Sequence, residues 1–160
     1  MSKFIAYCDG GCRGNQEKDN VGGWGVVITY GTHKHEMRGG KIGTTNNQME
    51  IKSVISALKS VRGAGHIDME IYSDSAYVVN CMNQRWMKDW IRNGWRNSKN
   101  KPVKNKELWL ELNKLISERS CTPKFFKVKG HSGVELNERA DQLANEAMDE
   151  IQQSLAKESD

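Results

Sequence analysis

Two repeating patterns of hydrophobic residues divide this chain into strands and helices. Short runs rich in β-branched and aromatic residues predict five strands, at residues 3–9, 22–30, 34–40, 67–73 and 122–127. Apolar residues spaced three and four apart predict helices at about 46–61, after Ser75, at 104–119 and from about Val134 past Ile151. This order of elements indicates a mixed α/β fold, with no internal repeat and no linker that would divide it.

The helix at 46–61 and the last helix have the clearest apolar stripes. Asn46 or Asn47 can cap the first of them, and the glycines at 63 and 65 end its pattern. The inward positions are Ile51, Val54, Ile55 and Leu58 in the first helix, and Ala140, Leu143, Ala144, Ala147 and Ile151 in the last. We therefore expect residues 1–152 to form a single domain and residues 153–160 to form a frayed tail.

The composition is that of an ordinary globular domain. Of the 160 residues, 37% are hydrophobic and 28% are charged, and no apolar run approaches the roughly 20 residues of a membrane span. No secretory signal is recognised, and the four cysteines lack the spacing of a disulfide framework or a zinc ribbon. We expect a cytoplasmic monomer with reduced thiols and no membrane segment.

Positive charge is concentrated in one segment. Residues 85–106 contain eight lysines or arginines and one acid, Asp89, which gives +7; the whole chain carries +4, so the rest carries −3. The same segment contains Trp86, Trp90 and Trp95. Basic residues interleaved with aromatic ones suit a phosphate backbone and the sugar and base faces beside it, so we interpret the segment as a nucleic-acid contact. The alternative is a solvated helix face with the tryptophans turned to the core.

Four acidic residues stand at the ends of predicted elements and not on solvated faces. Asp9 ends the first strand and Asp74 follows the fourth, while Glu50 and Asp141 lie near the starts of two helices. Strand ends are where open α/β sheets place their sites, so we expect these side chains to gather at one edge. Gathered carboxylates repel one another, and a hard divalent cation is the commonest reason for a protein to tolerate that. For Glu50 or Asp141 alone, an acid interacting with the helix dipole is the alternative.

Five short motifs stand in an order that resembles a known family. They begin at Asp9, Thr44, Ser73, Val128 and Asn137, and read DGGCRGN, TTNNQME, SDSAYV, VKGHSG and NERAD. Each motif alone is weak, but five in order at compatible spacing, from about residue 3 to 150, resemble bacterial type 1 ribonuclease H. The basic segment at 85–106 is similar to the basic protrusion of that branch. The resemblance implies a ribonuclease H-like fold, an α/β five-stranded mixed sheet flanked by helices on both faces.

The resemblance also implies an activity, the hydrolysis of the RNA strand of an RNA–DNA hybrid. By the family pattern, Asp9, Glu50, Asp74 and Asp141 would hold two Mg²⁺ ions, with Mn²⁺ as a substitute. One ion would lower the pKa of an attacking water and the other would stabilise the leaving 3′ oxygen, which leaves 5′-phosphate and 3′-hydroxyl ends. His131, in a loop flanked by glycines, would assist proton transfer or product departure.

Substrate contacts follow from the resemblance position by position. Contacts to sugar hydroxyls and minor-groove edges, through which RNA is distinguished from DNA, match Cys12, Asn15, Asn46 and Asn47. A pocket for a phosphate of the DNA strand matches Thr45 and Asn105. The basic protrusion would contribute Arg85, Trp86, Lys88, Trp90, Arg92, Trp95 and Arg96.

Two other classes of protein fit part of this pattern. A hybrid-binding module that has lost catalysis would share the substrate residues, but all four carboxylates and His131 are present here. A junction resolvase, or the nuclease domain of a reverse transcriptase, would share the sheet and the acids. A resolvase has no need for a pair of asparagines that reads RNA.

Overall fold

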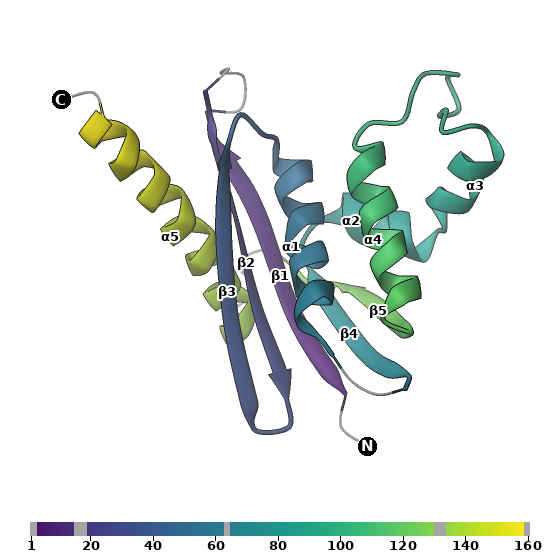
Figure 1. Cartoon of the computed structure of the whole chain (residues 1–160), viewed down its shortest axis with the longest axis horizontal. Coiled ribbons are helices and arrows are strands. Elements are labelled where there is room, and N and C mark those ends of the chain that lie inside the picture. The colour runs from purple at the N-terminus through teal and green to yellow at the C-terminus, as the bar shows by residue number, and fades with distance from the viewer. Residues whose placement is uncertain (1–2, 15–18, 63–64, 130–133, 159–160) are drawn as a thin grey trace.

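The computed structural model describes residues 3–14, 19–62, 65–129 and 134–158, which contain a five-stranded sheet with helices on both faces (Figure 1). The strands are β1 (Phe4–Arg13), β2 (Val21–Tyr30), β3 (His33–Ile42), β4 (Ile67–Ser73) and β5 (Cys121–Lys127). The helices are α1 (Asn46–Ser60), α2 (Ala76–Asn83), α3 (Trp86–Arg92), α4 (Lys106–Glu118) and α5 (Glu135–Glu158). The predicted fold class is confirmed.

The strand order β3-β2-β1-β4-β5 makes β1 the centre of the sheet. β1 pairs with β2, and β2 with β3, in antiparallel ladders, whereas the β1–β4 and β4–β5 pairs are parallel. The last β1–β4 partners are Cys8 and Ser73, so the next residues, Asp9 and Asp74, lie where this parallel pairing ends. β1 itself continues past Asp9, the predicted strand end, to Arg13 in its pairing with β2. The topology alone therefore brings together two acids that are 65 positions apart in the sequence.

Helices cover the two faces of the sheet unequally. The larger core lies between the sheet and helices α1, α2 and α4, and the stripe predicted for α1 (Ile51, Val54, Ile55 and Leu58) is fully buried in it. On the other face, α5 packs its small side chains against β1, β2 and β3, where Val27, Ala140 and Leu143 form a second, smaller cluster. Figure 1 shows α5 on one side of the sheet and the pair α1 and α4 on the other.

Arginines on the sheet and on α5 add polar contacts to this second interface. Arg13 donates to Asp149 at 2.8 Å, and Arg139 donates to Glu36 at 2.8 Å. Arg38 pairs with two glutamates of α5. These side chains are about one-third to one-half exposed, so each ion pair alone stabilises the fold little, and the network mainly fixes the orientation of α5.

Two local predictions are wrong. Thr45, not Asn46 or Asn47, is the N-cap of α1, because its backbone is extended (φ −128°, ψ 162°) and its hydroxyl accepts from the Gln48 backbone N–H at 3.1 Å. Residues 153–158, predicted to be frayed, continue α5, and Leu155 extends the apolar row of Ile151 toward Ile42 of β3. Within the part of the chain that the structure describes, no helix is both long enough and apolar enough to cross a membrane.

Candidate metal-binding active site

The four predicted acids meet at one cavity. Carboxylate oxygens of Asp9, Glu50 and Asp74 all lie within 4.8 Å of one another. The Asp141 carboxyl lines the same cavity, close enough to Asp9 to raise its pKa. The cavity has a volume of about 190 Å³, and its lining is Asp9, Gly10, Glu50, Asp74, Asn137, Glu138 and Asp141. The structure therefore gathers every carboxylate that the sequence singled out.

Asp74 is held between a strand end and a helix start. The hydroxyl of Ser73, the last residue of β4, accepts from the Ser75 backbone N–H at 3.1 Å. Ser75 is in turn the N-cap of α2, and its hydroxyl accepts from Val78 N at 3.2 Å. With both neighbours fixed by these bonds, Asp74 has a defined backbone on which to present its half-buried carboxylate.

Two glycines let the helices approach closely enough to complete the site. A Cβ on Gly10 would lie 2.4 Å from the Met49 carbonyl carbon, so only glycine allows α1 to bring Glu50 this close to β1. On the other face, Gly25 is the β2 partner of Asp9, and a Cβ there would lie 2.2 Å from the Ala140 carbonyl oxygen of α5. Asp141 follows Ala140, so this second close contact sets its distance from Asp9.

Burial and mutual repulsion raise the pKa of two of the carboxyls. The pKa of Asp9 is raised to about 8, first by burial, then by the charge of Asp74 and by the hydrogen bond and charge of Asp141, against a hydrogen bond from the Gly10 backbone. The pKa of Glu50 is raised well above its usual value, again first by burial and then by the charges of Asp9 and Asp74. The site therefore retains protons near neutral pH unless positive charge is supplied.

The donor set fits a hard divalent cation. Among the described residues, Glu50 Oε2 is buried and has no hydrogen-bond partner, which costs free energy unless a ligand satisfies the oxygen. The acidic groups that line the cavity all offer carboxylate oxygens, the donors that Mg²⁺ and Mn²⁺ prefer. An ion held there would reverse the repulsion that raises the two pKa values.

Sequence reasoning missed several residues that shape the site. Asn137 is buried in the first turn of α5 and lines the cavity beside Glu138. Asn20 is also buried, and its side chain both donates to the Thr44 carbonyl at 2.8 Å and accepts from Thr44 N at 2.9 Å. The role of Gly10 had a readable signal, since a glycine inside a strand often marks a close backbone approach. Asn20 had none, because an asparagine before a strand reads as an ordinary turn residue.

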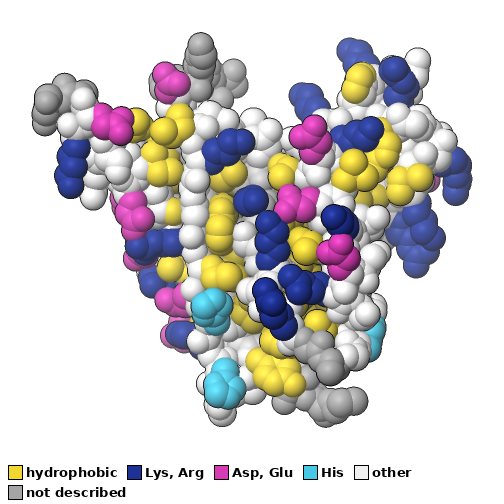
Figure 2. All heavy atoms as spheres, in the orientation of Figure 1, with side chains coloured by type: hydrophobic (Ala, Val, Ile, Leu, Met, Phe, Trp, Pro, Cys, Tyr) yellow, Lys and Arg dark blue, Asp and Glu magenta, His cyan; other side chains and the backbone are white. Residues whose placement is uncertain are grey.

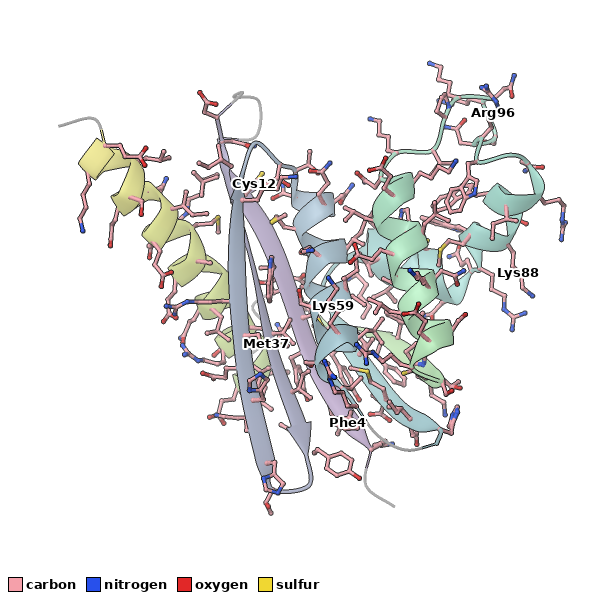
Figure 3. All side chains as sticks on the ribbon, in the orientation of Figure 1. Phe4, Cys12, Met37, Lys59, Lys88 and Arg96 are labelled. Atoms are coloured by element: carbon pink, nitrogen blue, oxygen red, sulfur yellow. The ribbon has the colours of Figure 1, made fainter. Side chains whose placement is uncertain are left out.

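Cys12 and Asn46, predicted to read sugar hydroxyls, lie side by side. The Asn46 side chain accepts from the Cys12 backbone N–H at 2.7 Å, which joins the end of β1 to the start of α1. Asn47 is exposed in the same first turn. Figure 3 shows Cys12 on β1 near the N-terminal end of α1. Asn15 and His131 lie outside the described residues.

Thr45 and Asn105, predicted to form a phosphate pocket, are joined through Gln48. The backbone N–H of Gln48 donates to Thr45, and its side-chain amide donates to Asn105 Oδ1 at 3.4 Å. Asn105 adopts a left-handed backbone (φ 63°), which asparagine tolerates better than most residues, and its amide donates to Tyr77 Oη at 3.3 Å. These contacts hold the N-terminal ends of α1 and α4 together.

The basic protrusion combines an exposed charged surface with an aromatic interior. Trp86, Trp90 and Trp95 are partly buried, and successive ring centroids lie 6.1 and 5.8 Å apart. Trp90 also packs against the fully buried Trp109 at 6.1 Å. The tryptophans thus follow the alternative interpretation in part, since they join the core, while the charged side chains stay exposed: Arg85, Lys88, Arg92 and Arg96. Figure 2 shows Lys and Arg gathered over this lobe, and in Figure 3 Lys88 and Arg96 point away from the body.

Comparison with known sequences places the chain in a family. The family model for RNase H matches residues 1–149. Ribonuclease H of Clostridium botulinum (strain Hall) is 49% identical over 151 residues, which cover 94% of this chain and 99% of that protein. Ribonuclease H of Syntrophomonas wolfei is 46% identical over 148 residues, covering 92% and 97%. The chain therefore belongs to the ribonuclease H family of nucleases.

Solved structures agree with this assignment. LC9-RNase H1, described as a type 1 RNase H with the type 2 active-site motif, is similar with a TM-score of 0.78 and 29% identity, over 92% of this chain and 72% of that one. LC11-RNase H1, solved in complex with an RNA/DNA hybrid, has a TM-score of 0.72 and 30% identity, over 93% and 99%. The resemblance to bacterial type 1 ribonuclease H is confirmed.

Proposed function

We propose that this protein is an endonuclease that hydrolyses the RNA strand of RNA–DNA hybrids with two divalent ions, leaving 5′-phosphate and 3′-hydroxyl ends. It would act as a cytoplasmic monomer. The observation that carries the proposal is the convergence of Asp9, Glu50 and Asp74 within 4.8 Å, with Asp141 beside them. A family member that had lost catalysis would have no reason to keep such mutually repelling, buried groups.

Mg²⁺ is the proposed cofactor, with Mn²⁺ as a substitute, and the four carboxylates would hold it. When bound, the ions supply charge that activates water and stabilises the leaving oxygen of an in-line displacement. The protein contributes the placement. Asp9 lies centrally, near both Asp74 and Asp141, while Glu50 approaches from α1 with one buried oxygen that has no partner among the described residues.

The selection of RNA over DNA is assigned to residues at the end of β1 and the start of α1. A 2.7 Å hydrogen bond joins the Asn46 side chain to the Cys12 backbone N–H. Because this bond already orients the Asn46 side chain, that side chain would lose little conformational entropy on contacting a substrate. A pair held in this way suits the reading of 2′-hydroxyls along the minor groove, with Asn15 and Asn47 as further contacts. On the other strand, Thr45 and Asn105 would receive a DNA phosphate.

The protrusion would bind the phosphate backbone through Arg85, Lys88, Arg92 and Arg96. These cations are exposed and lie on a lobe stiffened by packed tryptophans. Lys and Arg contacts to phosphate give affinity without sequence selectivity, and they weaken as salt is added. The partly exposed rings of Trp86, Trp90 and Trp95 would contact sugars at the rim of the same surface.

One assay tests the proposal. Labelled RNA–DNA hybrid, RNA–RNA and DNA–DNA duplexes are incubated with the protein in Mg²⁺, Mn²⁺ or EDTA, and the product ends are mapped. We expect cleavage of the RNA strand of the hybrid alone, dependent on metal, with 5′-phosphate ends. Cleavage of DNA–DNA duplex, or activity that survives EDTA, would contradict the assignment.

His131 is assigned the auxiliary role of moving a proton or easing product departure. Because the carboxylates would remain in place, His131→Ala should lower turnover by about 10- to 100-fold and not abolish it. His66, an exposed histidine in the sequence before β4, offers a matched control, and His66→Ala should leave turnover unchanged. If His131→Ala lowered turnover as completely as the removal of a carboxylate, the role of His131 would be essential and not auxiliary.

A further inference from the structure

Three aromatic rings form a row across one face of the sheet. Tyr7 on β1 is the register partner of Tyr72 on β4, which is the partner of Phe126 on β5. The ring centroids of Tyr7 and Tyr72 lie 5.1 Å apart at an interplanar angle of 15°, and those of Tyr72 and Phe126 lie 5.2 Å apart at 23°. The rings are therefore stacked one on the next, from the centre of the sheet to its edge.

This row lies on the face that carries the acids. Gly10 faces α1, and side chains alternate along a strand, so Asp9 and Tyr7 both face the opposite side, where Tyr7 packs beside Ala140 and Leu143. Tyr7 and Tyr72 each lie two residues before a catalytic acid, Asp9 and Asp74. At roughly 3.3 Å per residue, the row begins about 7 Å from the carboxylates.

Phe126 ends the row at an open edge. Both faces of Tyr72 are covered by its neighbours, but among the described residues Phe126 has one neighbouring ring, and 39% of its surface is exposed. β5 is the last strand of the sheet, on the side away from α5 (Figure 1). The adjacent Phe125 is buried in the main core, so Phe126 is the ring that turns outward. A cross-strand pair explains the contact with Tyr72, and in the described part of the chain no second ring packs against Phe126.

The surroundings of Phe126 are basic. Lys124 lies two residues earlier on the same strand and the same face, and Lys127 and Lys129 follow; all three are exposed. The nearby Glu70 is a carboxylate whose charge is already paired. Hydrogen bonds from Lys3 and Tyr72 and, to a smaller degree, the charge of Lys124 lower its pKa. An exposed ring bordered by lysines is the combination that binds single-stranded nucleic acid, because every base has a stacking face and every linkage a negative charge.

We propose that the outer face of Phe126 stacks an unpaired base of the same RNA strand that is cut at the carboxylates, with Lys124 and Lys129 contacting its phosphates. The occupant is single-stranded, because a base inside a duplex already has neighbours on both faces. It belongs to the RNA strand, because that is the strand the adjacent acids would engage. This inference rests on the proposed function. Stacking on Phe126 would give the enzyme a preference for hybrids from which single-stranded RNA extends.

The test compares four hybrids that share one duplex. One is blunt, two carry a short single-stranded extension of the RNA strand at one end or the other, and one carries the extension on the DNA strand. Binding is measured by fluorescence anisotropy in EDTA, and KM by cleavage in Mg²⁺. For the wild type, an RNA-strand extension at one end should lower both Kd and KM by about fivefold, the low end of the range for one base stacked on an aromatic ring.

Two substitutions separate stacking from other effects. Phe126→Leu keeps an apolar side chain at an exposed position but removes the ring, so the RNA-strand extension should no longer lower Kd and KM. In Phe126→Trp the extension should still lower both. Tyr30→Leu is the matched control, since Tyr30 is 41% exposed and packs against Phe4 with ring centroids 4.4 Å apart, yet lies at the far end of β2. The ratio of the KM for the extended hybrid to the KM for the blunt hybrid should be the same in Tyr30→Leu as in the wild type.

The outcomes are separable. If blunt hybrid is not cleaved by the wild type, the proposed function fails. If it is cleaved, but the extension brings no gain, brings the same gain on the DNA strand, or keeps its gain in Phe126→Leu, the stacking proposal alone is overturned.

Discussion

The acidic edge and the basic protrusion are built in opposite ways. The edge draws Asp9, Glu50, Asp74 and Asp141 from four distant parts of the chain, so their spacing depends on the whole fold. The first two are buried and the other two are half-buried. The protrusion is one continuous segment whose cations are all exposed around a small tryptophan interior. From this difference we expect geometry to determine function at the edge and the number of charges to determine it in the protrusion. Substitutions at the edge should therefore act on turnover, and substitutions in the protrusion on affinity.

The largest effect is expected at the edge. Asp9→Asn removes a metal ligand and leaves the protrusion intact, so hybrid cleavage should fall by roughly a thousandfold or more while hybrid binding changes little. Asp89→Asn, a similar change of an exposed acid within the protrusion, is the control and should keep its turnover. Turnover within tenfold of wild type in Asp9→Asn would refute the assignment of the carboxylates.

The second prediction concerns the close approach of α1. In Gly10→Ala the new methyl would lie 2.4 Å from the Met49 backbone, so the helix must shift, and we expect a decrease of about 1–3 kcal/mol in the free energy of unfolding, with reduced turnover. The neighbouring Gly11 has only an Asn46 oxygen at 3.6 Å, an ordinary contact, so Gly11→Ala should change stability by about 0.5 kcal/mol or less. Denaturant titration of both variants measures the difference, and equal stabilities would show that Gly10 does not set the spacing.

The third prediction tests whether affinity depends on the charges of the protrusion. Replacing four of its exposed cations, Arg85, Lys88, Arg92 and Arg96, with Ala should weaken hybrid binding and reduce the salt slope of log K by roughly one unit for each phosphate that the variant no longer binds. Saturating substrate should restore most of the turnover, because the carboxylates are untouched. A second quadruple variant removes the same charge elsewhere, at Lys34, Arg62, Lys114 and Lys157, and should change the slope less. Equal slopes in the two variants would mean that the protrusion does not touch the backbone.

The smallest effect concerns stability without metal. Asp9 binds its proton more tightly in the folded state, where its pKa is about 8, than in the unfolded chain, where it is near 4. The folded state therefore loses stability as pH rises from about 4 through 8. Asp9→Asn cannot acquire this charge, so in EDTA it should be more stable than the wild type at pH 7, with the gap narrowing toward pH 4.

Thermal melts across this range, in EDTA and in Mg²⁺, check the prediction. Mg²⁺ should stabilise the wild type more than the variant, because it binds the folded site. A lower melting temperature for Asp9→Asn in EDTA at pH 7 would indicate that Asp9 is held by favourable hydrogen bonds and not crowded by its neighbours.

The sequence predicted the parts of the structure that depend on local pattern. The predicted strand end located Asp74, and the helical stripe of α1 was confirmed residue by residue, whereas β1 continues past Asp9 to Arg13. It did not separate α3 from its surroundings or identify Thr45 as the cap, because a short helix and a choice among three adjacent polar residues carry little periodic signal. It also ended α5 too early, since the contacts that extend the helix come from β3, a strand more than a hundred residues away.

Gly10 and Gly25 have a consequence for which ion the site accepts. At Gly10 the sheet approaches α1 closely, and at Gly25 it approaches α5 closely. Together the two glycines set the distance between these helices at the level of Asp9. Mg²⁺ requires oxygen distances near 2.1 Å and Ca²⁺ about 2.3–2.6 Å, a difference smaller than the displacement that one added methyl would force. We therefore expect selectivity between ions of different radius to depend on interlayer spacing, and to change with side-chain volume on α1 or α5 while every proposed ligand stays in place.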